Sequence, residues 1–370
     1  MKPAVESLIS LSICLAAGAC LFLLAFNRLI IGMTESRTKD AITGSTLLAL
    51  TVVPAAAGWI LGFSVWLILP GLFLASIAAG EIWRVCVRRK CHALGPIETR
   101  GFRVSLSQPL TTCDLAVMRY EIAAPQWLLP RLRVAHISDL HVSDKLPMDY
   151  YAMVMERVSE SDPDLLLISG DFVARARFAP LLRGILPQAR ARCGAFAVLG
   201  NHDHWSGAAA IEDAIRQSGI VLLGNGSRRV GIGGGGSVVL CGCEDPWSPE
   251  PWRAPAPEPG GLLLGISHTP DNIDKFRAAG AFAVFAGHCH AGQIRVPRRG
   301  SIIVPSVYGR RFDHGHFQVG ATHLFVTSGI GAYSPAFRVY CQPDIFIVDI
   351  LAAMSSAPEG TPGNGRPEKV

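Results

Sequence analysis

Two long uncharged apolar segments stand near the start of the chain. Residues 7–26 and residues 41–80 contain no Asp, Glu, Lys or Arg. A helix of about 20 apolar residues crosses a bilayer, so the first segment has the length of one transmembrane helix and the second the length of two. The pattern predicts a membrane anchor with about three transmembrane helices in residues 1–83. A signal peptide cleaved near residues 17–20 is the alternative, but the apolar run continues to Phe26.

Basic residues follow these segments and set their orientation. The sequence RVCVRRK, residues 84–90, comes after the last predicted helix, and Arg28, Arg37 and Lys39 lie between the first two. With three helices, both basic segments lie on the same side, which their positive charge identifies as cytoplasmic. We therefore expect a multi-pass protein of the cytoplasmic (inner) membrane, with the rest of the chain facing the cytoplasm beyond a basic juxtamembrane linker at residues 84–104.

The rest of the chain repeats a different pattern, a short apolar run that ends in Asp, Asn or His. Such runs predict buried strands, here at residues 132–141, 164–171, 195–203, 261–268 and 281–290. Helical stretches at residues 149–160 and 207–219 alternate with the earlier strands, so the predicted fold class is α/β. We expect one domain over residues 105–352, followed by a disordered tail at residues 353–370, whose Pro, Gly and charged residues cannot form a core.

The polar residues at the strand ends are candidate metal ligands. In an open α/β sheet, ligands bind beyond the carboxyl ends of the strands, so these side chains should meet in one crevice. Asp139 and His141 are two residues apart, as are His288 and His290, and in extended chain such pairs point to the same side. The carboxylate of Asp171 has two oxygens and could bridge two ions. The candidate ligands are Asp139, His141, Asp171, Asn201, His268, His288 and His290. This mixture of oxygen and nitrogen suits Mn, Fe, Co or Zn better than Mg or Ca.

Composition narrows the remaining possibilities. The ten cysteines include no C-x-x-C pair, and a chain predicted to face the cytoplasm should keep them as free thiols. The formal net charge of +5 is about the size of the basic run that follows the predicted membrane helices. It therefore gives no reason to expect a nucleic-acid partner.

Several other polar residues lie outside the strand ends. His314-Gly315-His316 has the spacing of a ligand pair but follows no apolar run, so we expect a solvated loop there. The further histidines are His92, His204 and His323. We also expect a solvated loop for the arginine group Arg295, Arg298, Arg299, Arg310 and Arg311, with contact to an anionic substrate as the alternative.

The motifs together resemble a known family. The order SDLH, SGD, GNHD, SHTPD and GHCHAGQ is similar to that of the calcineurin-like metallophosphoesterase superfamily, and residues 326–350 resemble its bacterial membrane-tethered branch. The resemblance implies a four-layer α/β/β/α sandwich, preceded here by the transmembrane helices, with two metal ions between the sheets. Cys289 and Ala291 stand where this branch more usually has Thr and Gly, but neither is a ligand position.

The resemblance also assigns roles to residues. It implies Asp139, His141, Asp171 and His290 as ligands of one ion and Asp171, Asn201, His268 and His288 as ligands of the other. His202 would be the catalytic histidine, with Asp203 orienting it. No substrate-binding residue and no protein partner is indicated.

These assignments lead to an expected activity. Two divalent metal ions, with Mn favoured among Mn, Fe, Co and Zn, would hold a bridging hydroxide that attacks phosphorus in a phosphodiester or pyrophosphate. A lipid-linked substrate such as UDP-2,3-diacylglucosamine is the leading candidate, because some membrane-associated relatives cleave it. The alternatives are a general phosphodiesterase or phospholipid phosphoesterase, and a non-catalytic membrane-tethered binding module of the same fold.

Overall fold

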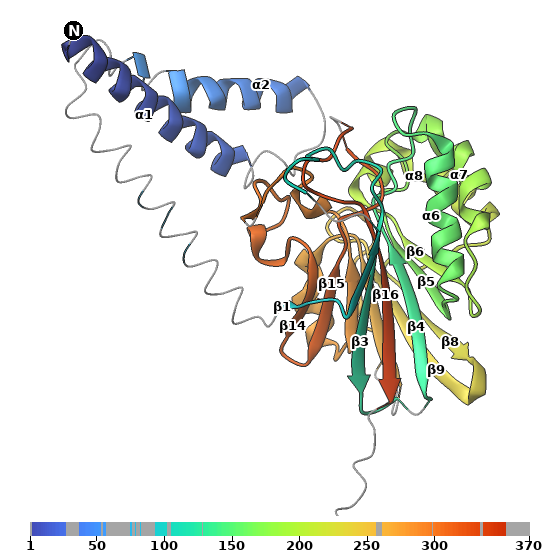
Figure 1. The fold of residues 1–370 in the computed structure, drawn as a ribbon. Helices are drawn as coiled ribbons and strands as arrows, with labels where there is room; N and C mark the ends of the chain where they lie inside the picture. Colours follow the sequence, from blue (N-terminus) through green and yellow to red (C-terminus); the bar gives the residue numbers. More distant parts are fainter. Residues whose placement is uncertain are drawn as a thin grey trace, which may run out of the picture.

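The structure of the chain is a computed structural model (Figure 1). It describes residues 2–26, 37–52, 55, 56, 75, 78, 82, 93–101, 105–127, 129–256, 261–297, 299–333 and 336–352. The predicted tail at residues 353–370 and most of the second apolar segment lie outside these residues.

The helices described in the N-terminal segment correct the membrane prediction. Helix α1 (Lys2–Ala25) is followed by α2 (Arg37–Leu47), which begins with charged residues and continues as a π-helix, η2 (Leu48–Val52). Within the described part of the chain, no helix combines the length and the apolar character needed to cross a membrane. The predicted location, a multi-pass protein of the cytoplasmic membrane with its domain facing the cytoplasm, is contradicted by this finding and is wrong.

One mixed sheet carries the first strand ends of the predicted site. Its strand order is β2-β3-β16-β4-β5-β6-β7, and β4 to β7 run parallel to one another. The strands are β2 (Glu98–Gly101), β3 (Ala116–Ala124), β4 (Arg131–Ile137), β5 (Leu165–Ser169), β6 (Ala195–Val198), β7 (Val221–Leu222) and β16 (Asp344–Ala352). The helices α6 (Met148–Glu160), α7 (Ala179–Ile185) and α8 (Asn201–Gln217) cover its outer face (Figure 1).

The second sheet carries the remaining strand ends. Its order is β1-β14-β15-β11-β10-β9-β8, with β9, β10, β11 and β15 parallel. The strands are β1 (Ala93–Leu94), β8 (Ser227–Ile232), β9 (Gly236–Cys243), β10 (Leu262–Ser267), β11 (Ala283–Ala286), β14 (Gly315–Val319) and β15 (Thr322–Val326). A short helix, α9 (Ile273–Ala278), packs on its outer face, and the hairpin of β12 (Arg295–Val296) and β13 (Gly300–Ser301) stands apart from both sheets.

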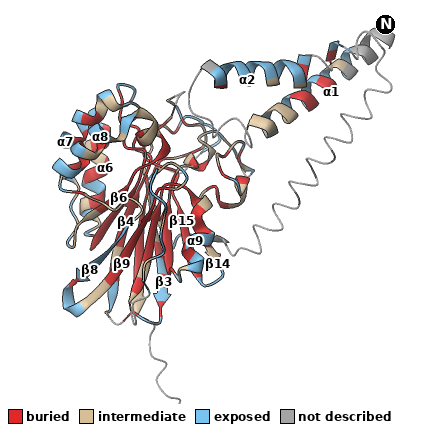
Figure 2. Cartoon of the chain, turned by 180° about the vertical axis from the view of Figure 1, so that it is seen from behind, coloured by how far each residue is buried: buried red, intermediate tan, exposed pale blue. Residues whose placement is uncertain are grey.

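Apolar side chains fill the spaces between these layers. The central cluster joins the two sheets, with Phe346, Phe285 and Phe325 among its buried rings, and Figure 2 shows the strands as the most deeply buried part of the fold. A second cluster packs α6, α7 and α8 on the first sheet, and a third packs Phe276 of α9 on the other. The α/β class is confirmed, and β4, β5, β6, β10 and β11 occupy the five predicted runs.

Two segments differ from the sequence interpretation. Residues assigned to the linker at 84–104 form the edge strands β1 and β2, one in each sheet. The prediction of a solvated loop at His314-Gly315-His316 is wrong, because Gly315 begins β14 and His316 is buried against Phe325. Nε2 of His314 lies 2.5 Å from Oδ2 of buried Asp344, so this histidine is a hydrogen-bond partner of that carboxyl group.

Candidate metal centre

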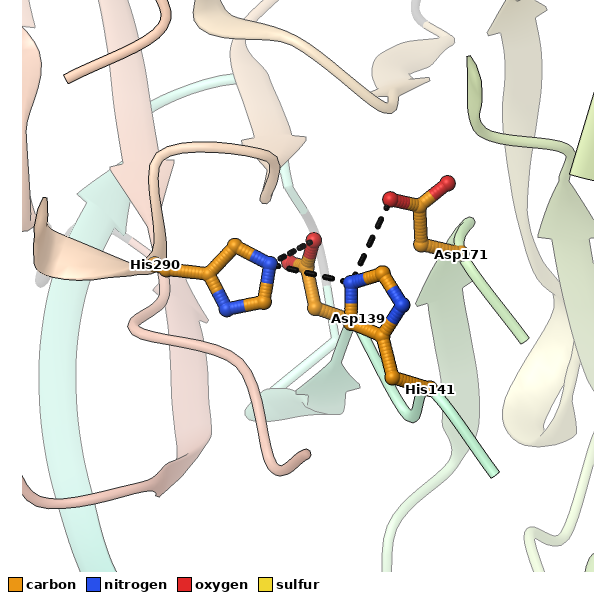
Figure 3. Close-up of side chains that lie close together, drawn as sticks. All are labelled: Asp139, His141, Asp171 and His290. Atoms are coloured by element: carbon orange, nitrogen blue, oxygen red, sulfur yellow. Dashed lines mark hydrogen bonds and ion pairs between the residues drawn. The ribbon is translucent and has the colours of Figure 1, made fainter. Parts of the chain in front are cut away.

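The two sheets present the carboxyl ends of their central strands to one another. Asp139 follows β4 and Asp171 follows β5 in one sheet, while His268 follows β10 and His288 follows β11 in the other. Asn201 is the first residue of α8, directly after β6. Because these ends lie at the same edge of the sandwich, residues more than 100 positions apart in sequence become neighbours. Figure 3 shows Asp139 and Asp171 close together with His141 and His290.

The first group of candidate ligands is Asp139, His141, Asp171 and His290. Nε2 of His141 and Nε2 of His290 face one another at 3.0 Å. A carboxylate oxygen of Asp139 lies 3.3 Å from Nε2 of His290, and one of Asp171 lies 3.4 Å from Nε2 of His141. One potential ligand atom from each of the four residues falls within 4.8 Å of the others, which is the spread expected around a single cation.

The second group contains Asp171, His268 and His288. Nε2 of His268 lies 3.3 Å from Oδ2 of Asp171 and 3.0 Å from Oδ1 of Asn201. Nδ1 of His288 lies 3.1 Å from the same nitrogen of His268. Asp171 is therefore common to both groups, and Asn201 adds a neutral oxygen to the second.

These contacts fit divalent cations by the chemistry of the donors. In each group, two imidazole nitrogens point at one another with carboxylate oxygens beside them, and the side chains of Asp139, His141, Asp171 and His268 are almost fully buried. Imidazole nitrogen together with carboxylate oxygen is the donor set of Mn, Fe, Co and Zn sites. A cation in each group would bind the imidazole nitrogens that here lie against one another.

The electrostatics leave most of these imidazoles neutral. Burial lowers the pKa of His141 and of His288 to about 3, so at neutral pH their nitrogen lone pairs are available to a cation. His268 is the exception. Burial would lower its pKa, but the neighbouring carboxylates of Asp171 and Asp139 outweigh that effect and raise it to about 9. Burial, assisted by the neighbouring carboxylate of Asp171, raises the pKa of Asp139 to about 6.

The backbone at the candidate ligands is left-handed, which the sequence did not predict. The φ angles are 50° at Asp139, 42° at His141, 55° at Asp171, 67° at His288 and 47° at His290. The expectation that each pair lies in extended chain is therefore wrong, although both members of each pair do reach the site. Asp and His tolerate this conformation better than most residues do.

Glycines give the ligands the space they need. A Cβ atom on Gly287 would lie 2.4 Å from Oδ2 of Asp139, and one on Gly200 would lie 2.2 Å from Oδ1 of Asp171. Each of these glycines directly precedes a candidate ligand, His288 or Asn201. The glycines of GHCH and GNHD therefore allow the backbone of one loop to pack closely against a carboxylate that another loop carries.

Asp203 joins two of the segments that carry candidate ligands. Its buried carboxylate accepts hydrogen bonds from the backbone amides of Gly200 at 3.0 Å and Phe172 at 3.0 Å, and a longer one from Val173. These bonds join the loop after β5 to the start of α8. Asp203 thus holds in place the two segments that carry Asp171 and Asn201. Its orientation of the His202 imidazole stays a prediction.

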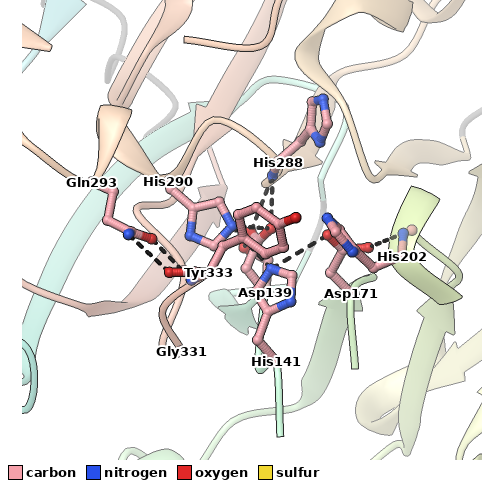
Figure 4. Close-up of polar contacts among 12 residues, drawn as sticks. Asp139, His141, Asp171, His202, His288, His290, Gln293, Gly331 and Tyr333 are labelled. Atoms are coloured by element: carbon pink, nitrogen blue, oxygen red, sulfur yellow. Dashed lines mark hydrogen bonds and ion pairs between the residues drawn. The ribbon is translucent and has the colours of Figure 1, made fainter. Parts of the chain in front are cut away.

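His202 lies beside the first group. Its backbone amide donates to Oδ1 of Asp171 at 2.9 Å, and its ring lies 5.0 Å from that of His141 and 4.6 Å from that of Tyr333. Figure 4 shows the Tyr333 ring among the candidate ligands. Two hydrogen bonds with Gln293 fix the Tyr333 backbone, and sequence analysis gave Tyr333 no role although it lies in the motif of residues 326–350.

A buried arginine, Arg338, binds the backbone of the loop that carries Tyr333. The guanidinium of Arg338 donates to the carbonyl oxygen of Ser328 at 2.7 Å and, through Nε, to that of Gly331 at 2.8 Å. The amide of Gly331 in turn donates to the carbonyl oxygen of Asp139 at 2.8 Å. Arg338 is completely buried, yet the sequence gave no signal for this role beyond its place in the same motif.

Three arginines of the group singled out in the sequence, Arg295, Arg310 and Arg311, make local contacts. Arg295 donates to the carbonyl oxygen of Ala291 and lies 3.6 Å from a carboxylate oxygen of Asp313. Arg310 donates to a backbone carbonyl, and Arg311 lies over the ring of Phe312. Arg298 lies outside the described residues.

Comparison with known proteins identifies the family. The calcineurin-like phosphoesterase family model matches residues 132–291. An uncharacterized metallophosphoesterase of Bacillus subtilis, YkuE, is 27% identical over 222 residues, which cover 58% of this chain and 77% of that protein. The phosphodiesterase YaeI of Escherichia coli is 27% identical over 225 residues, 59% of this chain and 82% of that protein.

A shorter match links the chain to a named pyrophosphatase. The UDP-2,3-diacylglucosamine pyrophosphatase LpxG of Chlamydia trachomatis is 38% identical over 87 residues, 21% of this chain and 26% of that protein. Together, these similarities show that residues 132–291 of this chain belong to the calcineurin-like phosphoesterase family. The chain is a metal-dependent hydrolase of phosphoric esters.

Proposed function

We propose that this protein hydrolyses a phosphodiester or pyrophosphate bond with two divalent cations, and that the domain of residues 105–352 carries this activity. The observation that carries the proposal is the position of Asp171. A single oxygen of its carboxylate lies 3.4 Å from Nε2 of His141 and 3.3 Å from Nε2 of His268, so one residue belongs to both groups of donors. A shared carboxylate is the usual link between two ions that act on one phosphoryl group.

The proposed ligand sets follow the two groups. Asp139, His141, Asp171 and His290 would hold one cation, and Asp171, Asn201, His268 and His288 the other. Bound cations would neutralise charge on the phosphoryl oxygens and increase the acidity of water. Mn is the favoured metal among Mn, Fe, Co and Zn.

His202 is proposed to transfer the proton that the leaving oxygen needs. Its backbone is anchored to Asp171, while its ring belongs to neither group of donors and lies beside His141 and Tyr333. An imidazole at the edge of the centre can protonate an alkoxide as it departs. Asp203 supports this role indirectly, because it fixes the start of the helix that carries His202.

The substrate class rests on the named relatives. One similar protein is a phosphodiesterase, and another acts on UDP-2,3-diacylglucosamine, a pyrophosphate with acyl chains. We propose a diester or pyrophosphate substrate, with a lipid-linked nucleotide such as UDP-2,3-diacylglucosamine as the specific candidate. A general phosphodiesterase is the second candidate, supported by the longer match to the phosphodiesterase.

A substrate panel tests the proposal. Purified protein loaded in turn with Mn, Co, Fe and Zn is assayed with bis-(p-nitrophenyl) phosphate, p-nitrophenyl phosphate and UDP-2,3-diacylglucosamine. We expect Mn-dependent hydrolysis of at least one diester or pyrophosphate, and its loss in Asp171→Ala. Protein that binds metal but hydrolyses no phosphoester with any of the four metals would instead be a binding module of this fold.

A further inference from the structure

A cavity of about 820 Å³ lies at the carboxyl ends of β6, β7 and β9. Leu199, which follows β6, and Glu244, which follows β9, line it together with His204 and Ala208 of α8. The turn after β7 and the loop of residues 248–253 form the remaining walls. Neither the proposed metal ligands nor the proposed acid His202 lines this cavity.

The cavity contains a histidine held by a buried carboxylate. Nε2 of His204 lies 3.1 Å from Oε2 of Glu244, whose side chain is only 6% exposed. The other oxygen of Glu244 accepts the amide of Leu199 at 2.7 Å, and the Glu244 amide donates to Oδ1 of Asn225 at 2.6 Å. Glu244 is thus held through its carboxylate and its backbone amide, and its other carboxylate oxygen holds the ring of His204.

This contact with Glu244 sets the hydrogen-bonding character of the two ring nitrogens of His204. Because the carboxylate of Glu244 is an acceptor, Nε2 of His204 carries the proton that joins them. In the neutral ring, Nδ1 is then an unprotonated acceptor, suited to a hydroxyl donor.

Two short segments connect the cavity lining to the second ligand group. The turn that begins at Glu244 places the amide of Trp247 2.9 Å from the Glu244 carbonyl oxygen, and the Trp247 ring lies 5.2 Å from the ring of His288. On the other side, His204 and Asn201 lie in the same first turn of α8. A phosphoryl group bound at the second ligand group would therefore have this cavity as its neighbour.

The charge of the lining argues against a second phosphate as the occupant. The carboxylates of Glu212, Glu244 and Glu250 line the cavity, against the two guanidinium groups of Arg216 and Arg253. Arg216 is already paired with Glu212 at 3.2 Å. Anions are bound by a surplus of donors and positive charge, which this lining lacks. Its apolar walls, including Leu199 and Leu223, suit an uncharged organic group.

We propose that this cavity binds an uncharged, hydroxyl-bearing substituent of the substrate, of the nucleoside or sugar class, and that Nδ1 of His204 accepts a hydrogen bond from one of its hydroxyl groups. The proposal rests on the proposed phosphodiesterase function and extends it, because it names the part of the substrate that lies away from the metals. His204 is then a specificity-determining residue, and Glu244 positions it.

Two substrates with the same leaving group test this proposal. Thymidine 5′-(p-nitrophenyl phosphate) carries a nucleoside, whereas methyl p-nitrophenyl phosphate carries none. We expect wild-type kcat/KM to be at least about tenfold higher for the nucleoside ester, with His204→Gln reducing that preference by about three- to tenfold, the effect of one lost hydrogen bond. Activity on the methyl ester should stay within about twofold of wild type.

A binding measurement and a matched variant complete the test. Titration calorimetry of metal-free protein with thymidine should give binding that is weaker in His204→Gln and in Glu244→Gln. His314→Gln makes the same change in a histidine–carboxylate pair outside the cavity and should leave both measurements unchanged. Equal kcat/KM of the wild type for the two esters, or equal losses on both in His204→Gln, would overturn this inference alone. Absence of hydrolysis of both esters and of UDP-2,3-diacylglucosamine would overturn the proposed function as well.

Discussion

Oδ2 of Asp171 lies 3.3 Å from Nε2 of His268, and this contact joins the carboxyl end of a strand in one sheet to that of a strand in the other. Asp171 follows β5 and His268 follows β10, so the pair closes the gap between the two layers of the sandwich. The same carboxylate oxygen also faces His141, which makes Asp171 the residue on which both groups of donors depend.

Asp171→Ala should therefore remove both metals. Two cations held close together repel one another unless a shared anion lies between them. We expect bound metal to fall from about two ions per chain toward none, and hydrolysis to be lost. Elemental analysis of purified protein gives the metal content, with Asp213→Ala on the exposed face of α8 as the control. Full metal occupancy in Asp171→Ala would show that this carboxylate does not bridge.

His202→Gln should retain the metals and lose turnover. Because its ring belongs to neither donor group, we expect kcat to fall by about two to four orders of magnitude on substrates with a poor alkoxide leaving group. The loss should be smaller with a nitrophenolate, which departs without a proton. Steady-state kinetics on the two kinds of substrate gives the comparison, with the metal content measured alongside.

The result also distinguishes the other roles that His202 could have. Equal losses on both kinds of substrate would mean that the imidazole stabilises charge and transfers no proton. Loss of one metal ion from His202→Gln would make His202 a ligand.

Arg338→Lys should disturb the loop whose Gly331 amide contacts Asp139. A lysine keeps the positive charge but cannot donate in the planar fork with which Arg338 contacts the carbonyls of Ser328 and Gly331. We expect the free energy of unfolding to fall by about 2 to 4 kcal/mol, because buried hydrogen-bond groups lose their partners. Chemical denaturation measures this change, and retained stability together with normal activity would contradict the role given to Arg338.

The stability of the fold should depend on the charge of Asp349 in β16. Burial alone would raise the pKa of this carboxyl, but hydrogen bonds from Arg133 at 2.7 Å and Arg119 at 2.6 Å outweigh burial and hold its pKa below the usual value. The folded state then binds a proton less readily than the unfolded state. The stabilisation is complete above about pH 4 and is lost as the pH falls through the folded-state pKa.

Asp349→Asn measures this contribution. At pH 7 we expect the variant to be less stable than wild type by about 2 kcal/mol, and we expect the difference to shrink toward pH 3. Urea denaturation of both proteins at the two pH values provides the comparison. A difference that does not change with pH would mean that the ionised carboxylate contributes nothing beyond its shape.

The strand ends were predictable because each motif is local. An apolar run followed at once by Asp139, Asp171 or His288 contains both the strand and its ligand in a few residues. His204 and Glu244 lie 40 positions apart, and their contact exists only because β9 and the start of α8 meet in space. A single sequence carries no signal for such a pair.

The errors also have physical causes. His316 is buried because β14 pairs with both β1 and β15, which no short-range pattern in HGHFQV revealed. The membrane prediction counted the absence of charge over residues 41–80. In the structure this segment begins in α2, whose first turn holds Arg37, Lys39 and Asp40, and the helix type changes at Leu48. Hydropathy records the preference of side chains for apolar surroundings and does not specify a continuous helix.

The left-handed turns at the candidate ligands limit how the centre could be redesigned. At Asp139, His141, Asp171, His288 and His290, a new residue must tolerate a positive φ before its donor atom has any effect. Asp, Asn and His accept that backbone far more readily than β-branched or bulky residues do. A mutant library aimed at a different metal preference should therefore yield folded variants mainly from exchanges among these three amino acids. Thiolate or glutamate donors would need a remodelled loop.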